Sequence, residues 1–261
     1  MPIQEKCRIE EHKQVGPRHF MLVLVSPYIA THAKPGQFVN VRLNETFNPL
    51  LRRPISLHRI NAQKGLIELL YEVVGRGTEL LSKNTIGSEL DLLGPLGHGF
   101  TVDPGKKVHL MVGGGMGIAP LRALGESLTG ARCVFLGAKD KASLVCGDQC
   151  GEIADQVAIS TDDGSAGKKG LVTDLLVDFL ASQLNTYDLP LTTIYACGPR
   201  PMLKAVAEIA AQKQVDCQVS MEERMACAIG ACKGCATRTR SGYKMVCSDG
   251  PVFDAKELLW N

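Results

Sequence analysis

Four cysteines lie close together near the end of this 261-residue chain and constrain its fold more than any other feature. They are Cys227, Cys232, Cys235 and Cys247, spaced C-x4-C-x2-C-x11-C. In a chain of this size without a secretory signal, such short spacings indicate metal binding or redox chemistry more than disulfides. No histidine follows His109, so this segment has no mixed cysteine and histidine ligand set.

The first three cysteines match the C-x4-C-x2-C run by which plant-type ferredoxins hold a 2Fe-2S cluster. Gly230 and Gly234 lie between them, and we expect positive φ angles there that turn backbone N–H groups toward the sulfurs. The fourth cysteine follows an expected hairpin across residues 241–242. Structural zinc, disulfides and unconnected buried cysteines are the alternatives. Zinc normally uses two C-x2-C pairs, and only Cys232 and Cys235 form one.

The first hundred residues have the sequence pattern of a β domain. Short apolar runs alternate with turn residues, and Gly94-Pro95 supplies one of the expected breaks. A small antiparallel barrel is the economical arrangement of such strands. The expected strands are Phe20–Val25, Gln37–Leu43, Ile55–Ile60, Leu66–Val74 and Glu89–Leu93.

After Gly105 the pattern changes to apolar strands alternating with helices, which predicts a parallel sheet with crossover helices. We therefore expect a barrel domain at 1–101, an α/β domain at 102–218 and a cluster segment at 219–261. The expected α/β strands are Lys107–Val112, Cys133–Gly137, Gln156–Ser160 and Leu191–Cys197, and the expected helices are Ile118–Leu128, Leu171–Leu184 and Met202–Gln212.

Two strand-to-helix turns of the α/β domain are candidates for nucleotide binding. Residues 113–117, Gly-Gly-Gly-Met-Gly, open a helix, so their backbone can approach a pyrophosphate at its N-terminus. Residues 197–202, Cys-Gly-Pro-Arg-Pro-Met, occupy the same kind of position. Ligands of open parallel sheets bind beyond the carboxyl ends of the strands, so both turns can face one crevice. A tight turn without a ligand is the alternative.

The barrel has two candidate motifs of its own. Arg53 in R-P-I-S offers a planar fork for a phosphate, and Ser56 offers a hydroxyl to a ring edge. Gly77 and Thr78 in G-R-G-T allow close backbone approach and add a donor. Taken alone, these motifs also fit an exposed arginine and an ordinary turn.

In this order, R-P-I-S, G-R-G-T, G-G-G-M-G-I-A-P and C-G-P-x-P-M resemble the ferredoxin-NADP reductase family over residues 1–218. The four-cysteine motif and the following S-D-G-P-V-F narrow the resemblance to electron-transfer subunits of dihydroorotate dehydrogenase B. It implies FAD between the first two domains and NAD(H) across the two turns, with the cysteines holding a 2Fe-2S cluster. The implied FAD contacts are Arg53, Pro54, Ile55, Ser56, Leu70, Tyr71, Glu72, Gly77 and Thr78. The implied NAD(H) contacts are Gly113, Gly114, Gly115, Met116, Gly117, Cys197, Gly198, Pro199 and Met202.

The resemblance also implies an FMN-containing catalytic partner, two copies of each subunit, and a role in pyrimidine biosynthesis. Plant reductases of the family end in an aromatic residue that covers the flavin, whereas this chain continues into the cluster segment. The sequence therefore leaves undecided which residue covers the flavin ring in this chain. The small subunit of an NADH-dependent ferredoxin:NADP oxidoreductase and a sulfhydrogenase reductase subunit are related alternatives. A zinc-stabilised nucleotide sensor is the alternative outside this class.

Redox chemistry gives the expected order of carriers. Reduced nicotinamide releases two electrons as a hydride, a 2Fe-2S cluster accepts one, and a flavin does both. No general acid, base or nucleophile stands out, so we assign no catalytic residue. The choice between NAD and NADP stays open, because Asp163 and Lys139 argue in opposite directions. Lys233, Arg238, Arg240 and Lys244 form either a solvated face or a guide for an electronegative partner.

Charge and hydropathy exclude other classes. The net charge of +2 gives no reason to expect binding to nucleic acid or an anionic membrane. No apolar run reaches the roughly 20 residues of a membrane span, and the charged N-terminus does not resemble a secretory signal. We expect a cytoplasmic protein. The other cysteines, Cys7, Cys133, Cys146, Cys150 and Cys217, are expected to be structural.

Overall fold

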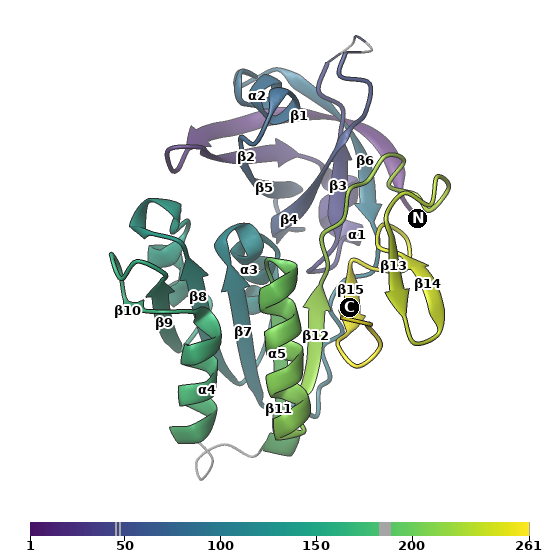
Figure 1. Ribbon diagram of the computed structural model, residues 1–261. Coiled ribbons are helices and arrows are strands. Elements are labelled where there is room, and N and C mark those ends of the chain that lie inside the picture. Colours follow the sequence, from purple (N-terminus) through teal and green to yellow (C-terminus); the bar gives the residue numbers. More distant parts are fainter. Residues whose placement is uncertain (45, 47, 183–188, 261) are drawn as a thin grey trace.

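The computed structural model describes residues 1–44, 46, 48–182 and 189–260, and its N-terminal part is a closed antiparallel barrel, as predicted (Figure 1). The strand order around the barrel is β1-β2-β5-β4-β3-β6. Alternate side chains such as Leu22 and Leu24 fill the interior, because neighbouring residues of a strand point to opposite faces. The strands are β1 Ile3–Gln14, β2 His19–Val25, β3 Phe38–Val41, β4 Arg53–Asn61, β5 Leu66–Glu72 and β6 Glu89–Leu96.

The barrel departs from the prediction in two respects. β6 runs through Gly94-Pro95, where a break was predicted; a Cβ on Gly94 would lie 2.8 Å from Val39, so this glycine permits close strand packing and forms no turn. β1 was not predicted, because only Cys7 and Ile9 of its side chains are buried. The short helices α1 Pro27–His32 and α2 Arg76–Ser82 were also missed, since neither is long enough to show a helical period.

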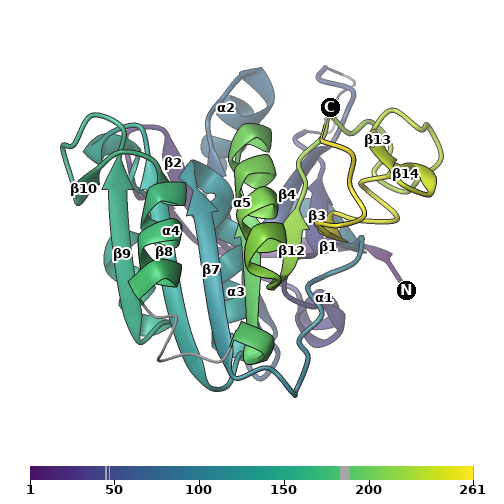
Figure 2. The ribbon, with the colours of Figure 1, turned by 60° about the horizontal axis from the view of Figure 1, so that its bottom comes forward.

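The second part is a seven-stranded sheet with the order β10-β9-β8-β7-β11-β12-β15. Its pairs are parallel except β12 with β15. Helix α3 covers one face, and α4 and α5 cover the other (Figures 1 and 2). The strands are β7 Val108–Gly114, β8 Ala131–Ala138, β9 Gln156–Thr161, β10 Lys168–Lys169, β11 Thr192–Cys197, β12 Asp216–Ser220 and β15 Val252–Asp254.

The predicted helices of this part are present. The described part of α4 ends at Ser182, and the predicted end at Leu184 lies outside the described residues. Short 3-10 turns lie between the longer elements. The helices are α3 Ile118–Ser127, α4 Val172–Ser182 and α5 Arg200–Lys213, and the 3-10 turns are η1 Gly115–Gly117, η2 Lys141–Ser143, η3 Gly147–Glu152 and η4 Leu189–Leu191.

The last forty residues join the cluster hairpin to both larger parts. β13 Ala236–Thr239 and β14 Gly242–Met245 form the predicted hairpin beside the sheet edge (Figures 1 and 2). β15 pairs with β12, with Phe253 opposite Val219, so this segment supplies the outer strand of the sheet. His98 at the end of the barrel forms a bridge with Pro251.

His58 of β4 connects the barrel to α3 from the centre of their interface. It is completely buried, and its Nδ1–H donates to the carbonyl oxygen of Ala119 at 2.9 Å, since a carbonyl can only accept. Burial lowers the pKa of His58 to about 4, and the positive charges of Arg122 and Arg59 also lower it. Both arginines form ion pairs with Glu126. The interface therefore requires a neutral imidazole.

Acidification is expected to weaken this structure through His58. The pKa of the ring is about 6.5 in the unfolded chain and about 4 in the folded one, so the unfolded state takes up the proton first. This lowers the free energy of unfolding by about 2 kcal/mol between pH 7 and pH 5. Thermal unfolding at both pH values measures the loss. The His58→Gln variant is expected to be less stable than wild type at pH 7, but to lose less free energy of unfolding between pH 7 and pH 5. An equal loss of stability in the two proteins would contradict this role of His58.

Candidate functional site

The two glycine-rich turns of the α/β domain pack directly against each other at the carboxyl ends of β7 and β11. A Cβ on Gly117 would lie 1.9 Å from the carbonyl oxygen of Cys197. A Cβ on Gly114 would lie 2.6 Å from the sulfur of Met202. Both glycines are therefore needed for loop-to-loop contact. The structure thus brings the two predicted turns into direct contact at the same edge of the sheet.

Gly115 serves a different purpose from its neighbours. Its φ is +54°, and a Cβ there would meet nothing within 4 Å. Among the glycines of the first turn, Gly115 is thus the one with open space at its Cβ position. On the second turn, burial raises the pKa of Cys197 to about 12, so this half-buried side chain is a neutral thiol.

Arg53 of the barrel lies against the first turn of α2. A Cβ on Gly77 would be 2.7 Å from Nε of Arg53 and 2.8 Å from Cδ1 of Leu43, so glycine leaves room for the guanidinium. Nη1 of Arg53 donates to the carbonyl of Leu51 at 2.8 Å. The Thr78 hydroxyl accepts the Val74 N–H at 3.0 Å and fixes the turn before α2. Together these contacts orient a cation beside a close-packed backbone, as a phosphate site requires.

The remaining predicted flavin contacts point in different directions. Tyr71 lies inside the barrel, stacked on Phe20 at 5.7 Å, with its hydroxyl 2.9 Å from Nε2 of His12. Ile55 also faces the barrel interior, whereas Leu70 packs in the apolar cluster between the barrel and α3. Pro54, Ser56 and Glu72 are half-buried. Tyr71 and Ile55 can therefore reach a flavin only through their backbone.

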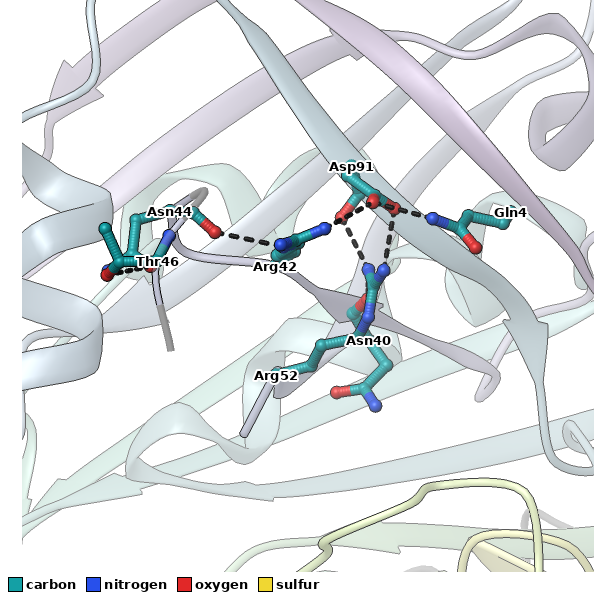
Figure 3. A network of polar contacts seen from close by, with 7 residues as sticks. All are labelled: Gln4, Asn40, Arg42, Asn44, Thr46, Arg52 and Asp91. Carbon is teal, nitrogen blue, oxygen red and sulfur yellow. Dashed lines mark hydrogen bonds and ion pairs between the residues drawn. The ribbon is translucent and has the colours of Figure 1, made fainter. Parts of the chain in front are cut away.

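Arg52 has a structural role that distinguishes it from Arg53 (Figure 3). Its Nη2 donates to the carboxylate of Asp91 at 2.9 Å, and its Nη1 donates to the Asp91 carbonyl at 2.9 Å. Gln4 donates to the same carboxylate at 2.7 Å. The network joins β1, β6 and the start of β4. A cavity of about 270 Å³ adjoins it, lined by Arg42, Leu43, Thr46, Pro49, Leu50, Leu51 and Arg52.

The four clustered cysteines receive backbone hydrogen bonds on every sulfur. The Cys232 N–H donates to Sγ of Cys227 at 3.3 Å, and the Cys247 N–H donates to Sγ of Cys235 at 3.4 Å. Gly230 donates to Cys247 at 3.1 Å, and the Gly234 N–H lies 3.5 Å from Sγ of Cys232. Such donors stabilise thiolate charge. Burial disfavours the thiolate of Cys227, but the N–H donors outweigh it and lower its pKa to about 7.

These contacts arrange the cysteines as two pairs, Cys227 with Cys232 and Cys235 with Cys247. A 2Fe-2S cluster takes two protein ligands on each iron, so two pairs fit it. Within the described part of the chain, no three His, Cys, Asp or Glu side chains surround a single ion position. Four thiol ligands that each receive a backbone N–H, with only one C-x2-C pair among them, fit a 2Fe-2S cluster better than structural zinc.

The predicted positive φ angles of the loop between the cysteines are present at one of the two glycines. Gly230 has the expected positive φ of 82°. Gly234 does not; the left-handed residues are Ala228 and Lys233, with φ of 60° and 57°. The loop therefore places non-glycine residues in a strained region, which is common where a site must be held in one shape. Cys232 is exposed, whereas Cys235 and Cys247 are each 2% exposed.

Comparison with known proteins assigns the family. The iron-sulfur cluster binding domain of dihydroorotate dehydrogenase B matches residues 222–259, and the oxidoreductase NAD-binding domain matches residues 111–208. The dihydroorotate dehydrogenase B (NAD(+)) electron transfer subunit of Desulforamulus reducens is 42% identical over 94% of each chain. That of Geobacillus thermodenitrificans is 38% identical over 98% of each chain. This chain belongs to that family of electron transfer subunits.

Solved structures agree with the family assignment. An NADH-dependent reduced ferredoxin-NADP oxidoreductase is 30% identical with a TM-score of 0.84, covering 97% of this chain and 90% of that chain. A ferredoxin NADP+ reductase from Neisseria gonorrhoeae, at 18% identity and a TM-score of 0.67, shares the fold over 80% of this chain and 91% of its own. The chain is an oxidoreductase subunit of this fold. Among the described residues, no helix has the length and apolar character to cross a membrane.

Arg200 of the second turn was given no contact by sequence reasoning. Arg200 lies inside C-G-P-R-P-M, yet only its neighbours were assigned to the nucleotide. The structure places Glu223 and Trp260 beside it, the first at 3.6 Å and the second with its ring centre at 5.9 Å. A charged residue within a binding motif was the available signal. Its partners could not be read from the sequence, because they lie 23 and 60 residues further along.

Proposed function

We propose that this chain passes electrons between NAD(H) and the FMN-containing catalytic subunit of a dihydroorotate dehydrogenase, in pyrimidine biosynthesis. It carries FAD and a 2Fe-2S cluster and uses NAD(H) as substrate. The flavin, when bound, exchanges a hydride with nicotinamide and single electrons with the cluster. The observation that carries the proposal is the presence in one chain of two hydrogen-bonded cysteine pairs and two nucleotide turns in direct contact.

The turns of the α/β domain bind and orient the nucleotide. Residues 113–117 supply the backbone near the open space at Gly115, and residues 197–202 form the adjoining wall. The neutral Cys197 thiol adds no charge beside the nicotinamide, which favours stacking against an apolar surface. No side chain would need to accept or give a proton here, because hydride transfer from nicotinamide to a bound flavin would not require a general acid or base.

The flavin would lie between the barrel and the α/β part, and the barrel residues that would hold it are Arg53 to Ser56, Leu70 to Glu72, Gly77 and Thr78. Arg53 supplies positive charge to the diphosphate, and Gly77 keeps the space that its guanidinium occupies. Cys227, Cys232, Cys235 and Cys247 hold the cluster. The three parts, 1–101, 102–218 and 219–261, thus bind FAD, NAD(H) and the cluster respectively.

Replacing Arg53 with glutamine is expected to weaken FAD binding about 10-fold or more, because a charge-assisted hydrogen bond to phosphate contributes about 1.5–3 kcal/mol. A fluorescence titration of the flavin-free protein with FAD measures the dissociation constant. Arg52→Gln is the matched control. It breaks the Asp91 network and should lower Tm, while FAD affinity stays within about threefold. Equal loss of FAD affinity in both variants contradicts the assignment of Arg53.

An electron transfer subunit acts with a catalytic subunit, and we propose an assembly of two copies of each. Within the cluster segment, Lys244 forms an ion pair with Glu257 and Arg240 donates to the carbonyl of Lys256, which favours a structural role for these two cations. Lys233 and Arg238 are exposed near the cysteines and remain candidates to guide a partner. We propose a cytoplasmic location, because a reducing compartment keeps ligand cysteines as thiols.

The test of this function is purification of the chain with its natural partner. Iron and FAD on this chain, FMN on the partner and dihydroorotate-dependent reduction of NAD+ are the expected results. The structural likeness to an NADH-dependent ferredoxin-NADP oxidoreductase makes that activity the second candidate. A partner that transfers electrons to ferredoxin and NADP, and that leaves dihydroorotate unchanged, overturns the proposed function in favour of the second.

A further inference from the structure

The motif S-D-G-P-V-F directly follows the cluster ligand Cys247 and takes no part in the proposed cofactor contacts. The carbonyl of Met245 accepts the N–H groups of Ser248 at 3.1 Å and of Asp249 at 2.7 Å. The Asp249 carboxylate accepts the Met245 N–H in return, at 2.6 Å. The Ser248 hydroxyl fills the space beside Gly230, where a Cβ would lie 2.8 Å from it. The turn that contains Cys247 is therefore closed by its own backbone and by Asp249.

The joint, residues 249–252, continues from this turn and lies against the end of the barrel strand β6. The His98 N–H donates to the carbonyl of Gly250 at 2.5 Å, and the Val252 N–H donates to the carbonyl of His98 at 3.4 Å. Gly97 has a φ of +72°, and a Cβ there would lie 2.5 Å from the same Gly250 carbonyl oxygen. Only glycine at position 97 thus allows the joint to sit this close to the barrel.

This end of the barrel is bonded to the strand that carries the proposed flavin contacts. Nε2 of Gln37 donates to the Gly97 carbonyl at 2.6 Å, and the Leu57 N–H donates to the Gln37 carbonyl at 3.0 Å. Leu57 directly follows Ser56 on β4. A continuous path of backbone and hydrogen bonds therefore leads from the residue next to Ser56 to the joint at Gly250.

The other side of the joint belongs to the α/β sheet. The carbonyl of Pro251 accepts the Met221 N–H at 2.8 Å, and Val252 pairs with Ser220 of β12. Ser220 pairs in turn with Cys197, where the second nucleotide turn begins. The joint therefore contacts the barrel and the sheet at once, with one strand between it and the nicotinamide turn.

We propose that the joint fixes the position of the cluster relative to the flavin, and that Gly97 and Asp249 are positioning residues for electron transfer between these two groups. The inference rests on the proposed function, in which a hydride from NADH gives the flavin two electrons and a proton. The two electrons leave one at a time through the cluster to the partner, and the proton is released to solvent. A shift of about 1 Å between reacting groups can cost about 10²-fold in rate, so a contact that sets their separation controls this step.

Gly97→Ala is expected to move the joint off the barrel, because the new Cβ meets the Gly250 backbone and no side-chain rotation relieves the contact. Rapid mixing of the flavin- and cluster-loaded chain with NADH, followed by absorbance, resolves the two steps. Reduction of the flavin should stay within about twofold of wild type, whereas reduction of the cluster should slow about 10-fold. Amide hydrogen exchange of residues 246–252 should become faster in the same variant.

Gly87→Ala is the matched control. Gly87 lies just before β6 and has a φ of +86°, but a Cβ there meets nothing within 4 Å. Alanine therefore adds backbone strain like that at Gly97 without touching the joint. Cluster reduction and the exchange of residues 246–252 should both remain as in wild type.

Asp249 gives an independent test that leaves the barrel untouched, and it decides the matter if Gly97→Ala does not fold. Asp249→Ala removes the acceptor of the Met245 N–H and should slow cluster reduction severalfold, whereas Asp249→Asn keeps a carbonyl acceptor and should restore it. Iron content and the electron paramagnetic resonance spectrum of the reduced cluster should match wild type in every variant. Loss of iron from Gly97→Ala and Asp249→Ala would make the joint a requirement for cluster assembly and overturn the proposal.

The inference and the proposed function fail in different ways. Wild-type rates of cluster reduction in Gly97→Ala and Asp249→Ala overturn the role of the joint alone. A wild-type chain in which NADH reduces the flavin but never the cluster overturns the proposed route as well.

Discussion

Replacing Cys232 with serine is expected to eliminate the 2Fe-2S cluster and electron transfer to the catalytic subunit, while NADH still reduces the flavin. Serine supplies a harder oxygen in place of the soft thiolate that an iron-sulfur cluster requires. The loss should exceed the roughly 10- to 100-fold effect of removing a hydrogen bond to a metal ligand. Iron analysis, the visible spectrum and dihydroorotate-linked turnover measure the loss, and turnover of NADH with an artificial acceptor measures what remains.

The exposed position of Cys232 makes this variant a clean test. Its side chain contributes little to the core, so the chain should fold with nearly the wild-type Tm. Cys146→Ser is the matched control, because Cys146 is not fully buried and lies in the α/β domain, outside the four-cysteine motif. It should keep iron and both activities. Full dihydroorotate-linked turnover in a Cys232→Ser protein without iron would remove the cluster from the electron path.

The sequence predicts the site best where chemistry depends on neighbouring residues of the chain. Cys227, Cys232 and Cys235 were identified from their spacing, and the structure brings them together with Cys247 at the ends of the predicted hairpin. The closed barrel and the parallel sheet followed from period-2 strands and from strand and helix alternation. The cysteine motif and each single strand or helix lie within one short stretch of the chain, so neighbouring residues are enough to recognise them.

Features that depend on distant contacts could not be predicted. The family resemblance implied Tyr71 as a flavin contact, and its ring stacks on Phe20, the residue directly opposite on the neighbouring strand β2. Whether a strand residue points into or out of the barrel depends on strand register, which the sequence does not give. Gly94 predicts a strand break when the sequence is considered alone. The structure shows that it instead makes room for Val39 of the neighbouring strand β3. The pairing of β15 with β12 is equally hidden, because three residues of strand carry almost no periodic signal.

Gly117→Ala is expected to reduce turnover of NADH with an artificial acceptor about 100-fold. The new Cβ would lie 1.9 Å from the carbonyl oxygen of Cys197 and 2.4 Å from its carbonyl carbon. Both are backbone atoms, so no side-chain rotation relieves the clash and the two turns must separate. A misplacement of about 1 Å at a reacting centre can cost about 10²-fold, and overpacking costs about 1–3 kcal/mol of stability. Steady-state kinetics and thermal unfolding measure the two effects.

Alanine variants of two other glycines separate the effect of packing between the turns from the effect of space for the nucleotide. Gly151→Ala, where a Cβ meets nothing within 4 Å, is the neutral control and should change neither turnover nor Tm appreciably. Gly115→Ala also meets open space but at a φ of +54°, so it should cost about 1 kcal/mol of stability and raise KM for NADH. Alanine at position 117 forces the two turns apart, whereas alanine at position 115 only narrows the approach of the nucleotide. The kcat should therefore fall in Gly117→Ala and hold in Gly115→Ala. Equal turnover in Gly117→Ala and wild type would mean that contact between the turns is not needed for hydride transfer.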